Sequence, residues 1–197
     1  MSDKGDIRQR VFALRSYTPI PFLVAMVIFA RPTLVSLVAG GMVVLLGEAI
    51  RLWGVSIVGA ETRTTGTVGG TYLVTSGPFA HVRNPLYVGN MLMYTGIGIM
   101  SLALFPWLPL AALVWFAIQY YLIVTREEEY LAERFGAAYA DYRAAVRRFL
   151  PRIVPYRSSA PSPKRLNLAE GLASERRTLQ AVALVAAALI ILYVLRA

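Results

Sequence analysis

The sequence predicts an all-α integral membrane protein with about five transmembrane helices. Of its 197 residues, 57% are hydrophobic and 16% are charged, and the mean hydropathy is +0.56. Much of the apolar sequence lies in five runs, and 18 of the 20 Lys and Arg residues fall in segments that one side of a membrane would share. Long apolar runs with a one-sided distribution of basic residues are typical of membrane-spanning helix bundles.

The apolar runs define the predicted spans, because a helix needs about 20 mainly apolar residues to cross the roughly 30 Å hydrocarbon core of a bilayer. The first run is short and contains two prolines, and Arg31-Pro32 ends it. Pro106 and Pro109 separate the third run from the fourth. The predicted spans are, in order, Tyr17–Ala30, Thr33–Val58, Leu86–Phe105, Leu108–Val124 and Leu179–Leu195.

The basic residues predict the orientation of the chain. With the N-terminus in the cytoplasm, every Lys and Arg except Arg31 and Arg196 lies on the cytoplasmic side, as the positive-inside rule favours. The net charge of +9 then reflects topology and attraction to lipid head groups. We expect a cytoplasmic N-terminus, an external C-terminus and no nucleic-acid partner.

Two cytoplasmic connections are too long to be simple turns. Residues 59–84 are rich in Thr, Gly and Ser, which predicts an irregular loop. Residues 125–177 begin with a charged helix whose aromatic residues recur at helical spacing, and they include a Ser/Pro-rich stretch. The expected organisation is a membrane core over residues 1–157, a linker over 158–177 and a C-terminal transmembrane helix over 178–197.

The second predicted span carries an acid, a base and a row of glycines. Glu48 and Arg51 are three residues apart, so they share a helix face and can form an ion pair, either functional or merely interfacial. Gly40, Gly47 and Gly54 recur every seven residues, which favours close packing against another helix.

Two polar segments lie at the cytoplasmic membrane boundary. Residues 73–89 form a turn-rich segment that enters a helix at Pro85, where backbone N–H groups can hold an anionic ligand; the alternative is a capped helix start with Arg83 at the head groups. Residues 126–129, Arg-Glu-Glu-Glu, place three acids where basic residues predominate. Either this run is solvated, or one carboxylate faces inward to receive a cationic group.

The first of these segments, with its Arg83-Asn84-Pro85-Leu86-Tyr87 turn, resembles the cofactor motif of the isoprenylcysteine carboxyl methyltransferase and phospholipid methyltransferase superfamily. A later series looks like the C-terminal signature of the same family. Together the two motifs cover roughly residues 71–151 in the family's order. The later series is Glu127-Glu128, Leu131, Phe135-Gly136, Tyr139, Tyr142, Val146, Phe149 and Pro151.

The resemblance implies S-adenosylmethionine as the cofactor. A carboxylate and aromatic faces suit the ammonium and sulfonium groups of this molecule. Helix-start N–H groups or Arg83 suit its carboxylate. The single His and the absence of Cys exclude Cys-ligated zinc and a His-rich site, so we expect no metal ion. The cofactor-binding residues that the resemblance implies are Thr71, Tyr72, Leu73, Val74, Phe79, Asn84, Pro85, Leu86, Tyr87 and Glu127.

The chain departs from the family at two places. Eukaryotic members have His where this chain has Asn84, so a role that needs a titrating imidazole is absent, and His81 is not taken as its substitute. The Arg that contacts substrate in eukaryotic members falls near Ile123, which leaves Arg126 as the candidate substrate-binding residue. No catalytic acid or base is assigned, because methyl transfer needs mainly in-line positioning and exclusion of water.

The expected function is S-adenosylmethionine-dependent methyl transfer at the cytoplasmic face. The acceptor is expected to be lipophilic, either an isoprenylcysteine-type carboxylate or another lipid-like carboxylate, amine or thiol that enters from the bilayer. The expected partners are this lipophilic or lipidated acceptor and membrane lipid. Two alternatives stay open: a sterol-reductase-like enzyme that uses NADPH, and a lipid-binding helix bundle without catalysis.

The orientation is testable with single cysteines, since the chain has none. In intact cells a membrane-impermeant thiol reagent should label Ala197→Cys and should not label Ser2→Cys. Both variants should react after lysis, which controls for the reactivity of each cysteine. Labelling of Ser2→Cys in intact cells would overturn the five-span arrangement.

Overall fold

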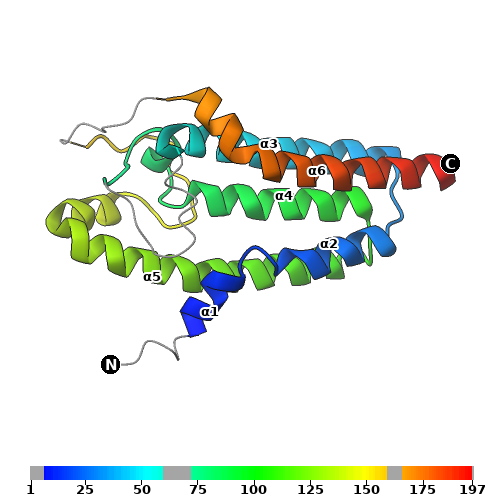
Figure 1. The fold of residues 1–197 in the computed structure, drawn as a ribbon, viewed down its shortest axis with the longest axis horizontal. Helices are drawn as coiled ribbons and strands as arrows, with labels where there is room; N and C mark the ends of the chain where they lie inside the picture. Colours follow the sequence, from blue (N-terminus) through cyan, green and yellow to red (C-terminus); the bar gives the residue numbers. More distant parts are fainter. Residues whose placement is uncertain (1–6, 60–71, 159–165, 197) are drawn as a thin grey trace. The chain divides into compact units, whose positions relative to one another are not determined.

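The computed structural model describes residues 7–59, 72–158 and 166–196 (Figure 1). Every regular element in these residues is helical, so the predicted all-α fold is confirmed. The helices are α1 (Ile7–Leu14), α2 (Pro19–Ile28), α3 (Leu34–Val58), the 3-10 turn η3 (Gly77–Ala80), α4 (Pro85–Ser101), α5 (Trp107–Ala145) and α6 (Leu168–Arg196).

Three of these helices, α3, α5 and α6, are long and apolar enough to cross a membrane. The apolar helix α2 has 10 residues and α4 has 17, so both are shorter than the length expected for a simple span. The described helices agree with an all-α membrane protein. The number of five spans stays a prediction.

The chain forms two compact units, and α3, α4, α5 and α6 each contribute residues to both. We call residues 1–48, 90–123 and 177–197 the membrane unit, and residues 49–89 and 124–176 the motif unit. All of the predicted cofactor and substrate residues belong to the motif unit.

Aromatic contacts join helices of the membrane unit. Phe116 of α5 is fully buried. The centroid of its ring lies 4.2 Å from the ring centroid of Tyr94 on α4 and 5.5 Å from that of Phe22 on α2. The outward positions of the unit are apolar as well, among them Val35 and Leu184, whose side chains are 78% and 72% exposed. An apolar outer surface is what a bilayer requires of the helices that it surrounds.

Two of the three glycines that the sequence singled out in α3, Gly40 and Gly54, lie at close contacts. In the membrane unit, a Cβ at Gly40 would lie 2.4 Å from the carbonyl oxygen of Gly96 and 2.5 Å from the backbone nitrogen of Met100, both on α4. In the motif unit, a Cβ at Gly54 would lie 2.7 Å from Cδ2 of Leu86. Each glycine therefore allows an approach that a larger residue would block.

The connections differ from expectation in two respects. α5 continues from the predicted fourth span through the charged segment and is interrupted at Gly136, whose φ is +50°. α6 begins at Leu168, so residues 168–177, which were expected to belong to a linker, are helical. Asn167 caps this start, since its side-chain oxygen accepts the N–H of Glu170 at 3.2 Å. Hydropathy marked only the apolar part of α6 and missed its capped polar beginning.

The irregular loop expected over 59–84 is described only in part. Residues 60–71 lie outside the described residues. From Tyr72 onward the segment is irregular except for the turn η3, and it leads directly into α4 at Pro85.

Gly40→Ala should destabilise the protein by about 1–3 kcal/mol, because the new methyl group meets backbone atoms of α4 and overpacking a close contact has roughly this cost. Gly41→Ala is the matched control, since nothing lies within 4 Å of a Cβ at that position. Thermal unfolding of both variants in one detergent should show a lower midpoint only for Gly40→Ala. Equal midpoints would contradict the close packing of α3 on α4.

Candidate functional site

Two predicted cofactor residues from different helices meet in the motif unit. The hydroxyl of Tyr87, in the first turn of α4, donates a 2.7 Å hydrogen bond to Oε1 of Glu127 on α5. Both residues are half-buried. Buried Pro85 opens α4, a position that suits proline and brings Tyr87 into the first turn. This contact connects the first sequence motif with the second.

The three consecutive acids of α5 have three different environments. Glu127 is half-buried beside Tyr87, Glu128 is buried, and Glu129 is exposed. Successive residues of an α-helix point about 100° apart, so one helix sends each carboxylate in its own direction. The carboxylate that faces inward to receive cationic groups is that of Glu128.

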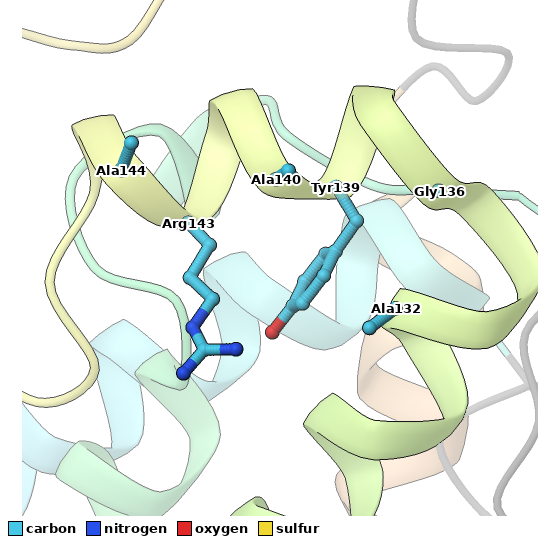
Figure 2. Close-up of a pocket in the computed structure, with 6 residues that line it drawn as sticks. All are labelled: Ala132, Gly136, Tyr139, Ala140, Arg143 and Ala144. Atoms are coloured by element: carbon cyan, nitrogen blue, oxygen red, sulfur yellow. The ribbon is translucent and has the colours of Figure 1, made fainter.

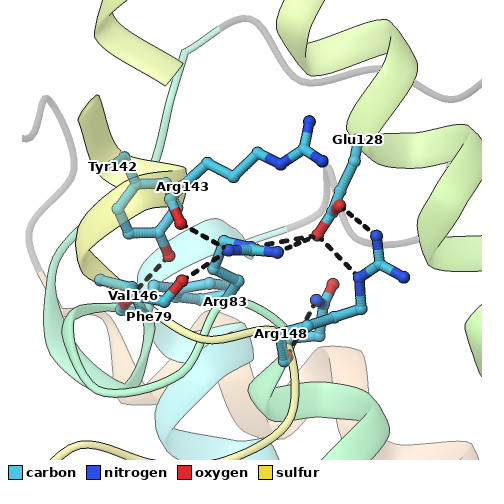
Figure 3. A network of polar contacts seen from close by, with 8 residues as sticks. Phe79, Arg83, Glu128, Tyr142, Arg143, Val146 and Arg148 are labelled. Atoms are coloured by element: carbon cyan, nitrogen blue, oxygen red, sulfur yellow. Dashed lines mark hydrogen bonds and ion pairs between the residues drawn. The ribbon is translucent and has the colours of Figure 1, made fainter. Parts of the chain in front are cut away.

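Glu128 lies between two arginines (Figure 3). Arg83 donates to its Oε1 from Nε at 3.0 Å and from Nη2 at 2.8 Å, and Arg148 donates to its Oε2 at 2.5 Å. Arg83 also donates from Nη1 to the carbonyls of Arg143 and Val146. Burial opposes ionisation of Glu128, but the hydrogen bonds from Arg148 and Arg83 outweigh it, so its pKa is below the usual 4.5. Because Arg83 makes these internal contacts, it holds the fold of the motif unit.

The segment before α4 is bound along its length to the segment after α5. His81 accepts the N–H of Arg152 with its carbonyl, and its Nδ1 donates to the carbonyl of Arg152, both at 2.9 Å. The side-chain amide of Asn84 donates to the carbonyl of Arg148 at 3.1 Å. His81 and Asn84 thus fix backbone positions on either side of Arg83.

The aromatic residues of the second motif form the core of the motif unit. Tyr139, Tyr142 and Val146 are buried together, and Leu73 and Phe135 pack against them. The hydroxyl of Tyr142 donates to the carbonyl of Phe79 at 2.7 Å (Figure 3). Their recurrence at helical spacing therefore reflects packing of α5 against the loop of the first motif.

A pocket of about 390 Å³ opens where α5 bends at Gly136 (Figure 2). Ala132 lies on one arm of the bend, and Tyr139 and Arg143 extend from the other. Burial raises the pKa of Tyr139 to about 12, so its phenol is protonated at neutral pH. Its buried hydroxyl has no hydrogen-bond partner among the residues that the structure describes. The lining residues are Ala132, Gly136, Tyr139, Ala140, Arg143 and Ala144.

The remaining predicted residues are distributed around this framework. Thr71 lies outside the described residues, Tyr72 is 39% exposed, and Val74 is half-buried. Leu86 packs on α3 at Gly54, and Arg126 is half-buried on α5. The structure thus brings the end of the Asn84–Tyr87 turn to Glu127, and cofactor and substrate binding by these residues stays a prediction.

The sequence did not reveal the ion pair between Arg51 and Glu175. The sequence showed only that Arg51 shares a helix face with Glu48. The structure pairs Arg51 with Glu175 of α6 at 2.8 Å, 124 positions along the chain. Glu48 itself is buried in α3. No local spacing relates two residues so far apart, so only the fold shows their contact.

Comparison with known proteins finds one family and a pair of curated relatives. The family model of the phospholipid methyltransferases matches residues 35–138, just over half of the chain. The cobalt-zinc-cadmium resistance protein CzcN of Cupriavidus metallidurans is 34% identical over 134 residues, which are 67% of this chain and 56% of that protein. The nickel-cobalt-cadmium resistance protein NccN of Alcaligenes xylosoxydans xylosoxydans is 37% identical over 92 residues, 46% of this chain and 41% of that protein.

The chain thus spans about half the length of the curated relatives that it matches. No solved structure matches it. Among the described residues, no group of three or more His, Cys, Asp and Glu side chains is arranged to hold a metal ion.

The region that matches the family model includes the whole first motif, residues 73–89, and both residues of the Tyr87–Glu127 contact. It also reaches into the second motif as far as the bend of α5. The resemblance seen in the sequence is therefore confirmed at the level of the family. The chain belongs to the phospholipid methyltransferase family, which is part of the isoprenylcysteine carboxyl methyltransferase superfamily.

Proposed function

We propose that the protein transfers a methyl group from S-adenosylmethionine to a lipophilic acceptor. Membership of the family supports methyl transfer by a membrane protein in general. The single observation that supports this cofactor is the hydrogen bond between Tyr87 and Glu127, which places a carboxylate and an aromatic ring together at the start of α4.

The residues at this contact fit the charges of the cofactor. When bound, S-adenosylmethionine supplies a methyl group on a sulfonium, and it also carries an ammonium and a carboxylate. The carboxylate of Glu127 suits the ammonium, and the ring of Tyr87 offers a face to a cation. The first-turn N–H groups of α4, which the helix itself does not use, suit the carboxylate.

The main task of the protein in this proposal is to hold its binding groups in place. In-line alignment of the two reactants and exclusion of water supply most of the acceleration in methyl transfer. The ion pairs of Glu128 with Arg83 and Arg148 fix the entrance to α4 against α5, so Tyr87 and Glu127 keep their mutual position. We assign no general acid or base, and Arg126 is the candidate for an anionic head group on the acceptor.

The acceptor that we propose enters from the bilayer. The outward positions of the membrane unit are apolar, and lipid surrounds them in a membrane protein. A polar cofactor from water and an apolar acceptor from lipid meet most easily at the boundary between the two phases. The acceptor is therefore proposed to be a lipid-like carboxylate, amine or thiol, with an isoprenylcysteine-type carboxylate as one member of this class.

Glu127→Gln should weaken the binding of S-adenosylmethionine by about 1.5–3 kcal/mol, the usual contribution of a hydrogen bond to a charged group. The amide keeps the size of the side chain and removes the charge that faces the ammonium. Isothermal titration calorimetry on purified protein in detergent measures the loss.

The matched control for this test is Glu129→Gln, which removes the same charge from an exposed position two residues away. It should bind S-adenosylmethionine nearly as well as the unmodified chain. Equal losses for both variants would mean that the acids act only through total charge. Titration of the unmodified chain with NADPH adds a second control, because binding of NADPH without S-adenosylmethionine would favour a reductase.

Entry of the acceptor from the bilayer predicts a dependence on its tail length. In a series of acceptors with one head group, each CH₂ removed from the buried tail should weaken acceptor binding by about 0.8 kcal/mol. The affinity for S-adenosylmethionine should stay constant across the series. Methyl transfer rates at saturating S-adenosylmethionine give the Michaelis constant of each acceptor. A short water-soluble acceptor that is used as efficiently as its long-tailed analogue would rule out this route.

A further inference from the structure

The beginning of α6 is bound to the end of α3 within the motif unit. The guanidinium of Arg51 contacts both carboxylate oxygens of Glu175, with Nη2 2.8 Å from each and Nε 3.2 Å from Oε2. The side chain of Glu175 is only 1% exposed and that of Arg51 only 13%. Nearby, the N–H of Asn167 donates to the carbonyl of Ser56 at 2.7 Å. A buried ion pair and a backbone contact therefore hold the two helices together.

Arg51 also contacts the turn of the first motif. Its Nη1 donates to the carbonyl oxygen of Leu86 at 3.4 Å. The side chain of Leu86 packs over Gly54, one turn further along α3, where a Cβ would lie 2.7 Å from Cδ2. Arg51 thus lies between Glu175 of α6 and the residue that precedes Tyr87.

We propose that Glu175 and Arg51 are positioning residues for the cofactor site. Glu175 orients the guanidinium of Arg51, and Arg51 holds the carbonyl of Leu86, which sets the first turn of α4 and with it Tyr87. This inference rests on the proposed function, because it names what holds that site in place. It gives the beginning of α6 a role in the site, although α6 lies beyond the region that matches the family model.

The geometry of arginine explains how one contact constrains the other. A guanidinium is planar and presents its donors in a rigid fork, so the orientation of one edge fixes the direction of the remaining donor. Here Nε and Nη2 face Glu175, and Nη1 faces Leu86. The same rigid plane therefore connects the position of α6 to the start of α4.

Amide hydrogen exchange over residues 86–90 measures the order of this turn without any ligand. Glu175→Gln should accelerate exchange there about tenfold and weaken S-adenosylmethionine binding about tenfold, because Arg51 loses the charge that orients it. Glu170→Gln is the matched control, since Glu170 is exposed in the first turn of α6. It should change neither measurement.

A charge-swapped variant separates positioning from stability, because removing one member of a buried pair can unfold a protein. Arg51→Glu combined with Glu175→Arg restores the attraction between α3 and α6 but leaves no donor at position 51 for Leu86. Its thermal midpoint should return toward that of the unmodified chain. Exchange over residues 86–90 should stay fast, and S-adenosylmethionine binding should stay weak.

The possible outcomes distinguish this inference from the proposed function. Unchanged exchange over residues 86–90 in Glu175→Gln, or exchange in the swapped variant as slow as in the unmodified chain, would overturn the positioning role and leave the ion pair purely structural. An unmodified chain that binds no S-adenosylmethionine would overturn the proposed function, and the exchange measurements would still decide what Arg51 does to the turn.

Discussion

The ionised carboxylate of Glu128 is the group on which the motif unit depends. It joins Arg83, from the segment before α4, to Arg148, from the segment after α5, and Arg83 extends the connection to two backbone carbonyls. Leaving a buried charge without its partner is strongly unfavourable, so the loss of one of these ion pairs should weaken the others. Because Glu128 must face the arginines, the helix directs Glu127 toward Tyr87. The carboxylate of the candidate site is thus placed by the ion pairs of its neighbour.

The long connection between the two motifs becomes understandable from this arrangement. The chain leaves the motif unit along α4 and returns to it along α5, so residues 40 positions apart meet at the Tyr87–Glu127 contact. The membrane helices between them are thus part of what brings the motifs together. The family signature appears in the sequence as two separate pieces, and in the structure it is one cluster around the entrance to α4.

The features that the sequence predicted well are those that depend on local patterns. Hydropathy located α3, the first part of α5 and the apolar part of α6, and the spacing of Gly40 and Gly54 indicated their packing role. The motif pattern indicated that the segments of Tyr87 and Glu127 belong together. What local patterns could not show is which of three adjacent acids is buried, because this depends on the angle at which α5 meets the rest of the motif unit.

Ion pairs between residues far apart in the chain could not be predicted from the sequence either. Local spacing relates Arg51 only to the acid three residues before it on its own helix, and it could not indicate the ion pair with Glu175 of α6. The start of α6 was missed for a related reason. Its stability comes from the cap at Asn167 and from contacts with α3, and neither feature raises the hydropathy of the segment.

The continuity of α5 has a practical consequence. As a straight helix its 39 residues would extend about 58 Å, nearly twice the thickness of a bilayer's hydrocarbon core. The bend at Gly136 returns the last turns toward the loop of the first motif, where Tyr142 binds Phe79. One helix thus contributes residues to both the membrane unit and the motif unit, and α3, α4 and α6 are divided in the same way. No single cut in the polypeptide separates the motif unit from the membrane unit, so purification has to keep the whole chain in detergent or lipid.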